Sequence, residues 1–378
     1  MNPSRSPAPP PARPLPAGAH VVLVRFGSLG DVVKCTALPR LIKARFPDCR
    51  LTMVTAEAFA ELIRDNPHID RAIGFERREG LRGLLALGRR LRAEGVHLVV
   101  DVHQSLRSRV LRWTLRAPAV GYTKRTWQRL LLIRFRINTY RPPRGKEEDF
   151  LAALAPWGVT DDGAGTELFT GRVARAPAFR ERLGPELARI EAWRAQGLPV
   201  VGVAPVAAWE LKRWPLAHFR TLMEAYVART GGGLLVFGGP RDADAHALAA
   251  GLGGHALSLV GRTSLLESAH LASLCDTVVA NDTGMTHLSE AAGVDVVALF
   301  GPTSRELGYY PTRPGSAVVE RPLPCRPCTR MGEGRCTHPL PRACLVTITP
   351  DEVLARVLER LGPRRAKAAR APGAGGAP

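Results

Sequence analysis

The sequence lacks an apolar run long enough to cross a bilayer, although 45% of its 378 residues are hydrophobic. The first 19 residues, MNPSRSPAPPPARPLPAGA, lack the apolar core of a secretory signal peptide. They resemble a disordered Pro/Ala arm, and residues 362–378, GPRRAKAARAPGAGGAP, resemble a disordered tail. We therefore expect a cytoplasmic protein whose folded part covers residues 20–361.

Acidic residues are also scarce, because 34 Asp and Glu stand against 53 Lys and Arg and leave a net charge of +19. This excess favours an anionic partner, such as a phosphorylated substrate, an anionic membrane surface or nucleic acid. An arginine-rich genome would produce the same excess. The chain lacks an RNP-type aromatic motif and a zinc-finger spacing with two histidines, which argues against a nucleic-acid-binding protein.

Short apolar strands alternate with amphipathic helices in both halves of the chain. The strands include HVVLV, RLTMVTA and HLVVDV in the first half, and PVVGVAP, LLVF, DTVVAN and VDVVALFG in the second. Such alternation is typical of parallel sheets covered by helices. We predict an α/β fold with two doubly wound Rossmann-like domains, residues 20–160 and 161–361, and a connection around residues 140–165. Their cleft would face the carboxyl ends of both sheets.

The stretch RFGSLGDVV, residues 25–33, joins the first strand to a helix without the G-x-G-x-x-G fingerprint of a dinucleotide site. Its glycines, Gly27 and Gly30, permit a tight turn. Asp31 falls at the carboxyl end of the strand, where it could act as a general base toward a hydroxyl. The alternative is that Asp31 is only the N-cap of the helix.

A lysine follows the first strand of the second half, in WELKRWPLAHF. Lys212 would lie beside a helix that begins at Pro215, which suits a diphosphate. The alternative is a solvated lysine. We interpret Trp214 as a packing residue.

Another strand–helix junction occurs in VVANDTGMTHLSEAAG, where a strand ends at Asp282 and a helix begins at Thr283 and Gly284. The free N–H groups of a helix start bind phosphate oxygens without a metal. His287 lies on the first turn. Asp282 could instead be a plain N-cap, and His287 a satisfied core histidine.

Four cysteines cluster near the C-terminus with the spacing C-x2-C-x7-C-x7-C, and they are Cys325, Cys328, Cys336 and Cys344. This spacing allows a tetrahedral structural zinc, with His338 as a spare ligand. Disulfide or redox chemistry and four free thiols are the alternatives, and a reducing cytoplasm disfavours the disulfides. We place the segment, residues 324–345, outside the reaction centre, in a structural or acceptor-facing role.

Five stretches together resemble glycosyltransferase family 9, the lipopolysaccharide heptosyltransferases. They are RFGSLGDVV, KRWPLAHF, GGPRDADAHAL, LVGRTSLLESAHLASLCDTVVANDTGMTHLSEAAG and ALFGPTS, in family order over nearly the whole folded region. The resemblance implies a GT-B fold of two Rossmann-like domains. It also implies an inverting, metal-independent transfer from a nucleotide sugar, typically ADP-L-glycero-D-manno-heptose, to the inner core of lipopolysaccharide.

The resemblance assigns roles on the acceptor side and at the reaction centre. Asp31 matches the family's proposed base, in an acceptor-side loop that contains Ser28 and Gly30. Lys212 matches the lysine on the donor diphosphate. The implied mechanism has Asp31 taking the acceptor proton while Lys212 and the helix start at Thr283 stabilise the departing ADP.

The resemblance also assigns donor-binding residues. The N-D-T-G-x-x-H block matches at Asp282, Thr283, Gly284 and His287. An acidic residue on the nucleoside ribose is expected to be Asp242, with Asp244 as second choice, and Thr263 occupies the adenine-side loop. The chain departs from the family at Ala207 and Ala208. Well-studied members of the family carry hydroxyl residues at these positions, near the phosphates of the donor.

The leading hypothesis is therefore an inverting heptosyltransferase that needs no cofactor for catalysis and contains a possible structural zinc. Its expected partners are ADP-heptose, an anionic lipopolysaccharide-core acceptor and, peripherally, the inner face of the inner membrane, with no nucleic acid. Alternatives are a family 9 transferase that uses another nucleotide sugar for O-antigen or another glycan, a nucleotide-sugar epimerase, and a basic nucleic-acid-binding protein.

Overall fold

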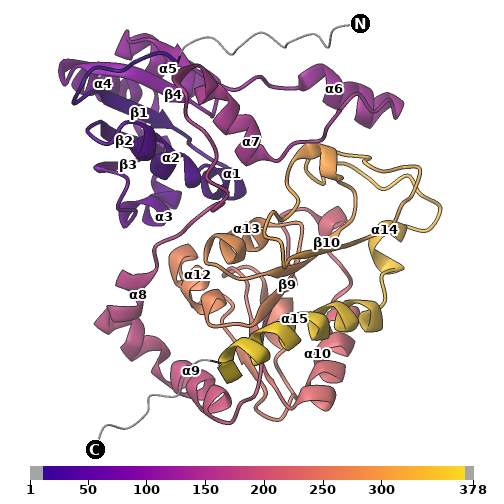
Figure 1. Cartoon of the computed structure of the whole chain (residues 1–378). Helices are drawn as coiled ribbons and strands as arrows, with labels where there is room; N and C mark the ends of the chain where they lie inside the picture. The colour runs from indigo at the N-terminus through magenta and orange to yellow at the C-terminus, as the bar shows by residue number, and fades with distance from the viewer. Residues whose placement is uncertain (1–11, 371–378) are drawn as a thin grey trace, which may run out of the picture. The chain divides into compact units, whose positions relative to one another are not determined.

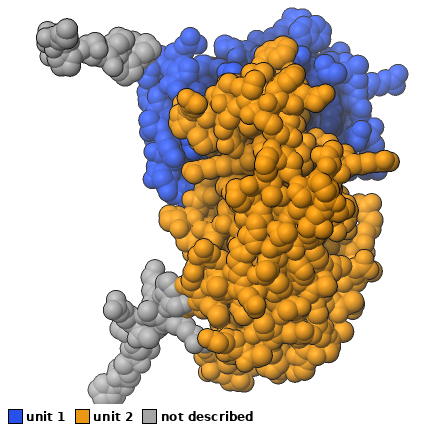
Figure 2. All heavy atoms as spheres, turned by 90° about the vertical axis from the view of Figure 1, so that its right-hand side faces the viewer, with its two compact units in different colours: residues 1–124, 147–165 blue, residues 125–146, 166–378 orange. Residues whose placement is uncertain are grey.

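The computed structural model describes residues 12–370, which form two compact units (Figure 2). Unit 1 contains the described residues up to Lys124 together with Glu147–Gly165. Unit 2 contains Arg125–Lys146 and the described residues from Thr166 onward. The change of unit at Gly165 lies close to the expected boundary at 160/161, but the segment Arg125–Lys146, expected in the first domain, belongs to unit 2.

Unit 1 is built on a five-stranded parallel sheet with the order β3-β2-β1-β4-β5 (Figure 1). The strands are β1 His20–Val24, β2 Arg50–Ala56, β3 Arg71–Phe75, β4 Val96–Asp101 and β5 Ala119–Val120. The helices and 3-10 turns between them are α1 Leu29–Lys34, α2 Ala37–Arg45, η1 Glu57–Phe59, α3 Glu61–Arg64, η2 Arg77–Glu79, α4 Gly80–Ala93 and α5 Leu106–Leu115. The central strand β1 is buried along its whole length, as an apolar strand covered on both faces must be.

Unit 2 is built on a six-stranded parallel sheet with the order β11-β10-β9-β6-β7-β8. The strands are β6 Val200–Ala204, β7 Gly233–Val236, β8 Ala256–Ser258, β9 Thr277–Asn281, β10 Val296–Phe300 and β11 Ala317–Glu320. The helical elements are α6 Thr126–Leu130, η3 Leu131–Phe135, α8 Gly171–Arg175, α9 Pro177–Ala195, η5 Glu210–Lys212, α10 Leu216–Thr230, α11 Ala243–Ala247, α12 Leu265–Ser273, α13 Gly284–Ala291, η6 Arg305–Leu307, α14 Ala343–Val346 and α15 Pro350–Arg370. These two sheets confirm the predicted α/β class.

The sheet of unit 2 buries apolar residues on both faces. Along β6, Val201 and Val203 join one cluster, while Val200 and Ala204 join the other, because successive side chains of a strand point to opposite faces. Helices α10 and α15 cover the first face, and α9 and α12 cover the second. The expected doubly wound arrangement therefore holds in this unit.

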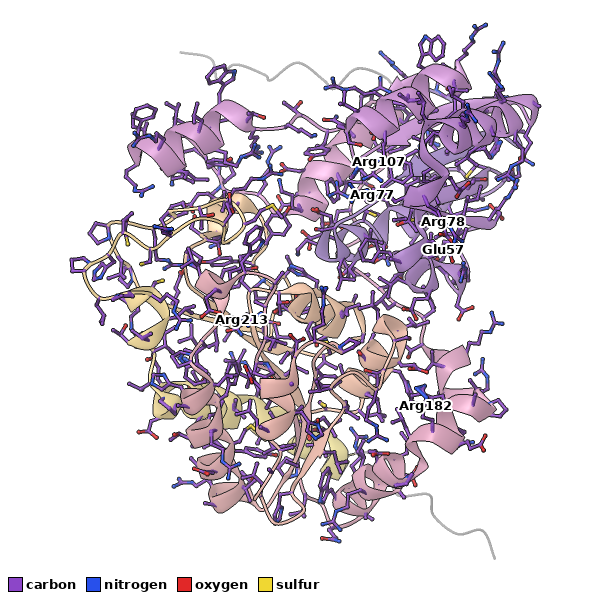
Figure 3. All side chains as sticks on the ribbon, turned by 180° about the vertical axis from the view of Figure 1, so that it is seen from behind. Glu57, Arg77, Arg78, Arg107, Arg182 and Arg213 are labelled. Carbon is purple, nitrogen blue, oxygen red and sulfur yellow. The ribbon has the colours of Figure 1, made fainter. Side chains whose placement is uncertain are left out.

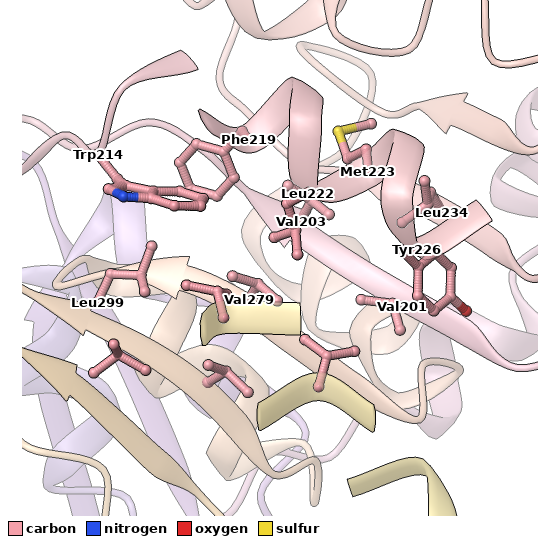
Figure 4. Packing of buried hydrophobic residues seen from close by; sticks show 14 of the residues in the cluster. Val201, Val203, Trp214, Phe219, Leu222, Met223, Tyr226, Leu234, Val279 and Leu299 are labelled. Atoms are coloured by element: carbon pink, nitrogen blue, oxygen red, sulfur yellow. The ribbon is translucent and has the colours of Figure 1, made fainter. Parts of the chain in front are cut away.

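Trp214 lies in the first of these clusters (Figure 4). Its ring is completely buried and packs edge-on against Phe219, with 4.8 Å between the centroids. Its indole N–H donates to the carbonyl of Ile348 at 3.0 Å, so the buried polar atom is satisfied. The interpretation of Trp214 as a packing residue is confirmed.

The expected connection at residues 140–165 is partly helical. It contains α7 Lys146–Leu151 and η4 Ala152–Trp157, and it buries Phe150, Leu154 and Trp157 in unit 1. These three apolar residues recur at helical spacing, and the first turn of α7 is acidic, as helix starts favour. The linker interpretation missed this pattern because prolines and charged residues surround it.

The ends of the described chain also differ from expectation. The backbone N–H of Arg13 donates to the carbonyl of Pro156 at 2.8 Å, so the part of the expected arm from residue 12 is ordered on unit 1. Helix α15 continues to Arg370, into the expected tail. Residues 1–11 of the arm and 371–378 of the tail lie outside the described residues. Within residues 12–370, none of the helices combines the length and the apolar character that a bilayer crossing requires.

Candidate active site

The loops that follow the strands of unit 2 carry the residues assigned to the donor. Strands β6 and β9 are neighbours, so the loops after them meet at one edge of the sheet. Lys212 ends η5, after β6, and Asp282 directly follows β9. Lys212 Nζ lies 2.6 Å from Asp282 Oδ2, and the side chains are 14% and 5% exposed. The alternative of a solvated lysine is therefore wrong.

Further hydrogen bonds hold this ion pair in place. The hydroxyl of Thr303 donates to Asp282 Oδ2 at 2.7 Å. At the end of β9, Asn281 accepts the backbone N–H of Trp214 at 3.0 Å and donates to the carbonyl of Pro205 at 2.8 Å. These bonds fix the segment between β6 and α10 against the end of β9. Because an ammonium has three N–H donors, the ion pair orients the lysine and leaves donor capacity for a phosphate.

Helix α13 begins directly beside this pair. Its N-cap is Thr283, so the alternative that Asp282 is a plain N-cap is wrong. The Thr283 side chain makes no capping bond to the first turn, whose N–H groups suit an anion. His287 is 4% exposed, and its ring centroid lies 6.1 Å from that of Tyr309. The structure thus places the whole N-D-T-G-x-x-H block at one corner of the sheet.

The residues assigned to the nucleoside lie on neighbouring loops of the same edge. Asp242 follows β7, and its carboxylate accepts the backbone N–H of Gly239 at 2.7 Å. Thr263 follows β8, and its hydroxyl lies 2.7 Å from that of Ser268. Since β6, β7 and β8 are consecutive in the sheet, the structure brings these loops and the Lys212 loop to one edge. Asp244 is exposed on α11.

In unit 1, Asp31 is buried at the carboxyl end of the sheet. It is the third residue of α1, whose N-cap is Ser28, so the alternative that Asp31 is itself the N-cap is wrong. Its Oδ2 accepts the hydroxyl of Ser28 at 3.0 Å and pairs with the guanidinium of Arg25. Asp31 is 8% exposed and Arg25 is 5% exposed. A buried, oriented carboxylate of this kind is suited to receive a proton from one defined direction.

Arg25 and His103 are two residues of this site that sequence reasoning missed. Arg25 donates to the carbonyl of Val102 and lies over the ring of Phe150, 5.2 Å from its centroid. Burial, with the nearby Arg25 charge, lowers the pKa of His103 to about 4, so its imidazole is neutral at neutral pH. His103 follows β4, the neighbour of β1. Polar residues that follow parallel strands lie at the carboxyl edge of the sheet, and this reasoning, which pointed to Asp282, also applies to His103.

Positive charge also gathers on the loops at this edge of unit 1. Arg77 and Arg78 follow β3, and Arg107 begins α5 after β4 (Figure 3). Arg107 lies over the ring of Phe26, 5.7 Å from its centroid. Arg78 pairs with Glu76 at 2.7 Å, and the contact of Arg107 with Phe26 places its charge beside the loop that leads to Asp31.

Comparison with known proteins extends these observations. The family model described as "Glycosyltransferase family 9 (heptosyltransferase)" matches residues 84–335, which is more than half of the chain. The chain belongs to glycosyltransferase family 9. It is therefore a glycosyltransferase, and its two sheets are the two halves of a GT-B fold.

Several family 9 proteins are similar over nearly their full length. Lipopolysaccharide heptosyltransferase 1 of Pseudomonas aeruginosa is 29% identical over 346 residues, covering 84% of this chain and 88% of that protein. Lipooligosaccharide heptosyltransferase 2 of Haemophilus influenzae is 23% identical over 352 residues, covering 90% and 99%. The crystal structure of the family 9 glycosyltransferase from Veillonella parvula superposes with a TM-score of 0.73 at 21% identity, covering 93% and 100%. The similarity to the Veillonella parvula structure supports the fold of this chain.

The cysteine-rich segment, residues 324–345, lies against η5, the turn of this family 9 transferase that carries Lys212. A Cβ on Gly332 would lie 2.7 Å from Trp209 Cβ and 3.0 Å from Lys212 Cγ. Arg342 donates to Glu210 Oε1 at 2.7 Å and to the carbonyl of Arg213 at 3.1 Å. The segment therefore packs against η5, and its place outside the reaction centre stays a prediction.

Arg326 ties the same segment to the loop after β10. Its guanidinium donates to the carbonyl of Gly301 at 2.5 Å and to that of Thr303 at 2.7 Å, and it pairs with Glu320 at 2.5 Å. Thr303 is the residue whose hydroxyl holds Asp282. The segment thus supports both members of the Lys212–Asp282 pair.

The four cysteines of the segment are free thiols. Burial raises the pKa of the Cys344 thiol to about 11 and also raises that of Cys328. Among the described residues, no three His, Cys, Asp or Glu side chains are placed to hold a metal ion. The geometry does not support the zinc site, which stays a prediction.

Proposed function

We propose that the protein is an inverting heptosyltransferase that moves a heptose from ADP-heptose to the inner core of lipopolysaccharide. The observation that carries the proposal is the buried Lys212–Asp282 pair at the start of α13. It occurs in a chain similar to proteins named lipopolysaccharide and lipooligosaccharide heptosyltransferases. The donor diphosphate would bind Lys212 and the first-turn N–H groups of α13, as anions bind at helix starts.

The proposed reaction divides its work between the two units. In unit 1, the Asp31 carboxylate takes the proton of the acceptor hydroxyl, whose oxygen attacks the anomeric carbon of the heptose. The bond from that carbon to the diphosphate oxygen breaks with inversion, and ADP leaves with the bonding electron pair. In unit 2, Lys212 and the start of α13 stabilise the charge that develops on ADP. These groups supply positive charge without a metal cofactor.

The donor would be placed by the other loops of the same edge. Asp242, or Asp244 in its stead, would bind the ribose, and Thr263 would lie beside the adenine. His287 and the rest of the block would hold the sugar-diphosphate. At the positions of Ala207 and Ala208, which lack hydroxyls, backbone amides would take over phosphate contacts. A zinc at the four cysteines would be structural, and metal analysis of the purified protein tests it.

The acceptor proposal rests on the charge of unit 1. Lipopolysaccharide inner core carries phosphates and carboxylates, which complement Arg77, Arg78 and Arg107 at the edge that holds Asp31. Such an acceptor is anchored in lipid, so we propose that the enzyme works peripherally at the inner face of the inner membrane.

The experiment is to measure ADP release from ADP-heptose with and without a heptose-deficient lipopolysaccharide core. We expect release that depends on the acceptor and produces a heptosylated core detectable by mass spectrometry. GDP-mannose and ADP-glucose serve as control donors. Turnover of another nucleotide sugar in place of ADP-heptose would overturn the donor assignment while the family stands. Binding of mixed-sequence DNA without any nucleotide binding would overturn the transferase proposal.

A further inference from the structure

Residues 125–146 form an unusual surface on unit 2. Within this stretch, α6 and η3 form one continuous helical segment of ten residues, Thr126–Phe135. The stretch contains seven Lys and Arg and no Asp or Glu. Arg129 and Arg134 lie on the helical segment, and the other five cations flank it. A run of cations without acids has the charge pattern of an anionic-lipid-binding element.

Three large apolar residues of this helical segment are exposed, as is Ile137 just after it. Trp127 is 76% exposed, Phe135 60% and Ile137 52%, and Leu130 is 45% exposed one turn after Trp127. In contrast, Leu132 is only 5% exposed and attaches the helix to the unit. Large apolar side chains exposed together on one element mark an interaction surface.

Hydrogen bonds hold the base of this surface firmly on unit 2. Arg136 donates to the carbonyl of Pro327 at 2.7 Å, in the cysteine-rich segment. Asn138 donates to Glu306 Oε1 at 2.9 Å, and the backbone N–H of Lys146 donates to the carbonyl of Gly308 at 3.0 Å. The outward side chains are therefore presented by an anchored element, and the segments that anchor it follow β10 and β11.

We propose that this segment docks the enzyme on an anionic phospholipid bilayer. Trp127, Leu130 and Phe135 enter the boundary between headgroups and acyl chains, where amphipathic aromatic rings are favoured. The exposed Arg134, Arg141 and Arg144 bind lipid phosphates through their planar guanidinium groups. Seven cations without an acid complement the continuous negative charge of an anionic bilayer, and exposed Trp and Phe suit its interface, so a bilayer is the partner that this surface fits. The inference deepens the proposed function by naming the element that brings the enzyme to a lipid-anchored acceptor.

The test is flotation of the full chain with vesicles of phosphatidylcholine alone and of phosphatidylcholine with phosphatidylglycerol. We expect binding to the anionic vesicles, at least about tenfold weaker without the anionic lipid. The double variant Trp127→Ser with Phe135→Ser should lower the partition coefficient by about tenfold or more. The matched control is Trp113→Ser, which removes another exposed Trp, 70% exposed on α5 of unit 1.

A second pair of variants tests the charge. Arg134→Glu reverses an exposed charge between Leu130 and Phe135 and should weaken binding about fivefold or more. Arg229→Glu makes the same change on the exposed face of α10 and should leave binding within about twofold. Added salt should weaken wild-type binding because it screens the arginines.

Three outcomes would overturn the inference. They are equal binding of the two vesicle types, wild-type binding by the Trp127 and Phe135 double variant, and self-association that this double variant abolishes, which would make the surface a contact between copies. Transfer to a delipidated core oligosaccharide separates the two proposals. Docking without transfer would contradict the proposed function alone, and transfer without docking would contradict this inference alone.

Discussion

At the residue scale, two buried aspartates have different surroundings. Asp282, directly after β9, is held by Lys212 and by the hydroxyl of Thr303. Asp31 is held by Arg25 and Ser28 within its own loop and helix. The same side chain type therefore has two proposed uses: Asp282 orients an ammonium, and Asp31 receives a proton.

Replacing Asp31 by Asn tests the proposed base. The amide keeps the shape of the carboxylate but does not accept the proton, so we expect kcat to fall by about 10²- to 10⁴-fold. ADP binding, measured by calorimetry, should stay within about twofold because Asp31 lies in unit 1 and the proposed nucleotide site in unit 2. The control Ser28→Ala removes one hydrogen bond to the carboxylate and should cost much less. Wild-type kcat in Asp31→Asn would rule out the assignment.

Replacing Lys212 by Met tests the charge on the diphosphate. We expect kcat/KM for the donor to fall by about 10²- to 10³-fold, because the variant loses the cation that stabilises departing ADP and leaves Asp282 without its partner. Lys43→Met is a matched control, since Lys43 forms an ion pair with Asp70 at 2.7 Å in unit 1. If both variants lose activity equally, the loss reflects stability and not the donor site.

The pKa of His103 predicts a pH dependence of stability. In the folded protein burial lowers this pKa to about 4, whereas the unfolded value is near 6.5. Between pH 6.5 and 4 the unfolded state binds more protons, so the free energy of unfolding falls as the pH falls through that window.

The variant His103→Gln should flatten this part of the profile, measured as urea midpoints at pH 7.5, 5.5 and 4.5. The exposed His246, replaced by Gln, is the control and should leave the slope as in wild type. A slope that persists in His103→Gln would assign the proton uptake to another group.

At the element scale, the cysteine-rich segment supports η5. Gly332 has φ +102° and packs against Trp209 and Lys212, whereas Gly334 has φ +91° with nothing near its missing Cβ. The two positions share the backbone requirement for glycine but differ in what surrounds them.

Gly332→Ala and Gly334→Ala should each lower the free energy of unfolding by about 1–3 kcal/mol, because both place a side chain in the left-handed region. Only Gly332→Ala should displace η5, and we expect it to weaken ADP binding about tenfold or more. Calorimetry with ADP and urea titrations measure both quantities. Equal ADP affinities in the two variants would show that the contact with Lys212 has no role in donor binding.

At the scale of the whole molecule, each unit has its own sheet and its own buried clusters. Every residue assigned to the nucleotide lies in unit 2. We therefore expect ADP alone to slow amide hydrogen exchange in the segments 205–214 and 281–287, while residues 29–34 of α1 stay as in the free protein. GDP at the same concentration is the control. Protection from exchange in α1 alone would show that ADP binds to unit 1.

Residue pattern alone predicts the class of the fold and the sheet edge at which the candidate residues lie. Apolar runs alternating with helical periodicity require parallel sheets, and polar residues directly after those runs must lie at the carboxyl edge. This is why Asp31, Lys212 and Asp282 could be named before any coordinates. Buried Trp214 followed from the same reasoning, because an aromatic residue beside a strand end packs more often than it stacks on a ligand.

The packing of distant segments determines which side chains contact Lys212 and Asp282. The hydrogen bond of Thr303 to Asp282 and the contact of Gly332 with η5 join segments that are distant in the sequence, and local pattern carries no record of them. The assignment of residues 125–146 to unit 2 is of the same kind, since the hydrogen bonds that hold the segment reach residues far along the chain. Periodicity reports only which face of an element is buried, whereas the packing of distant elements selects what lies against it.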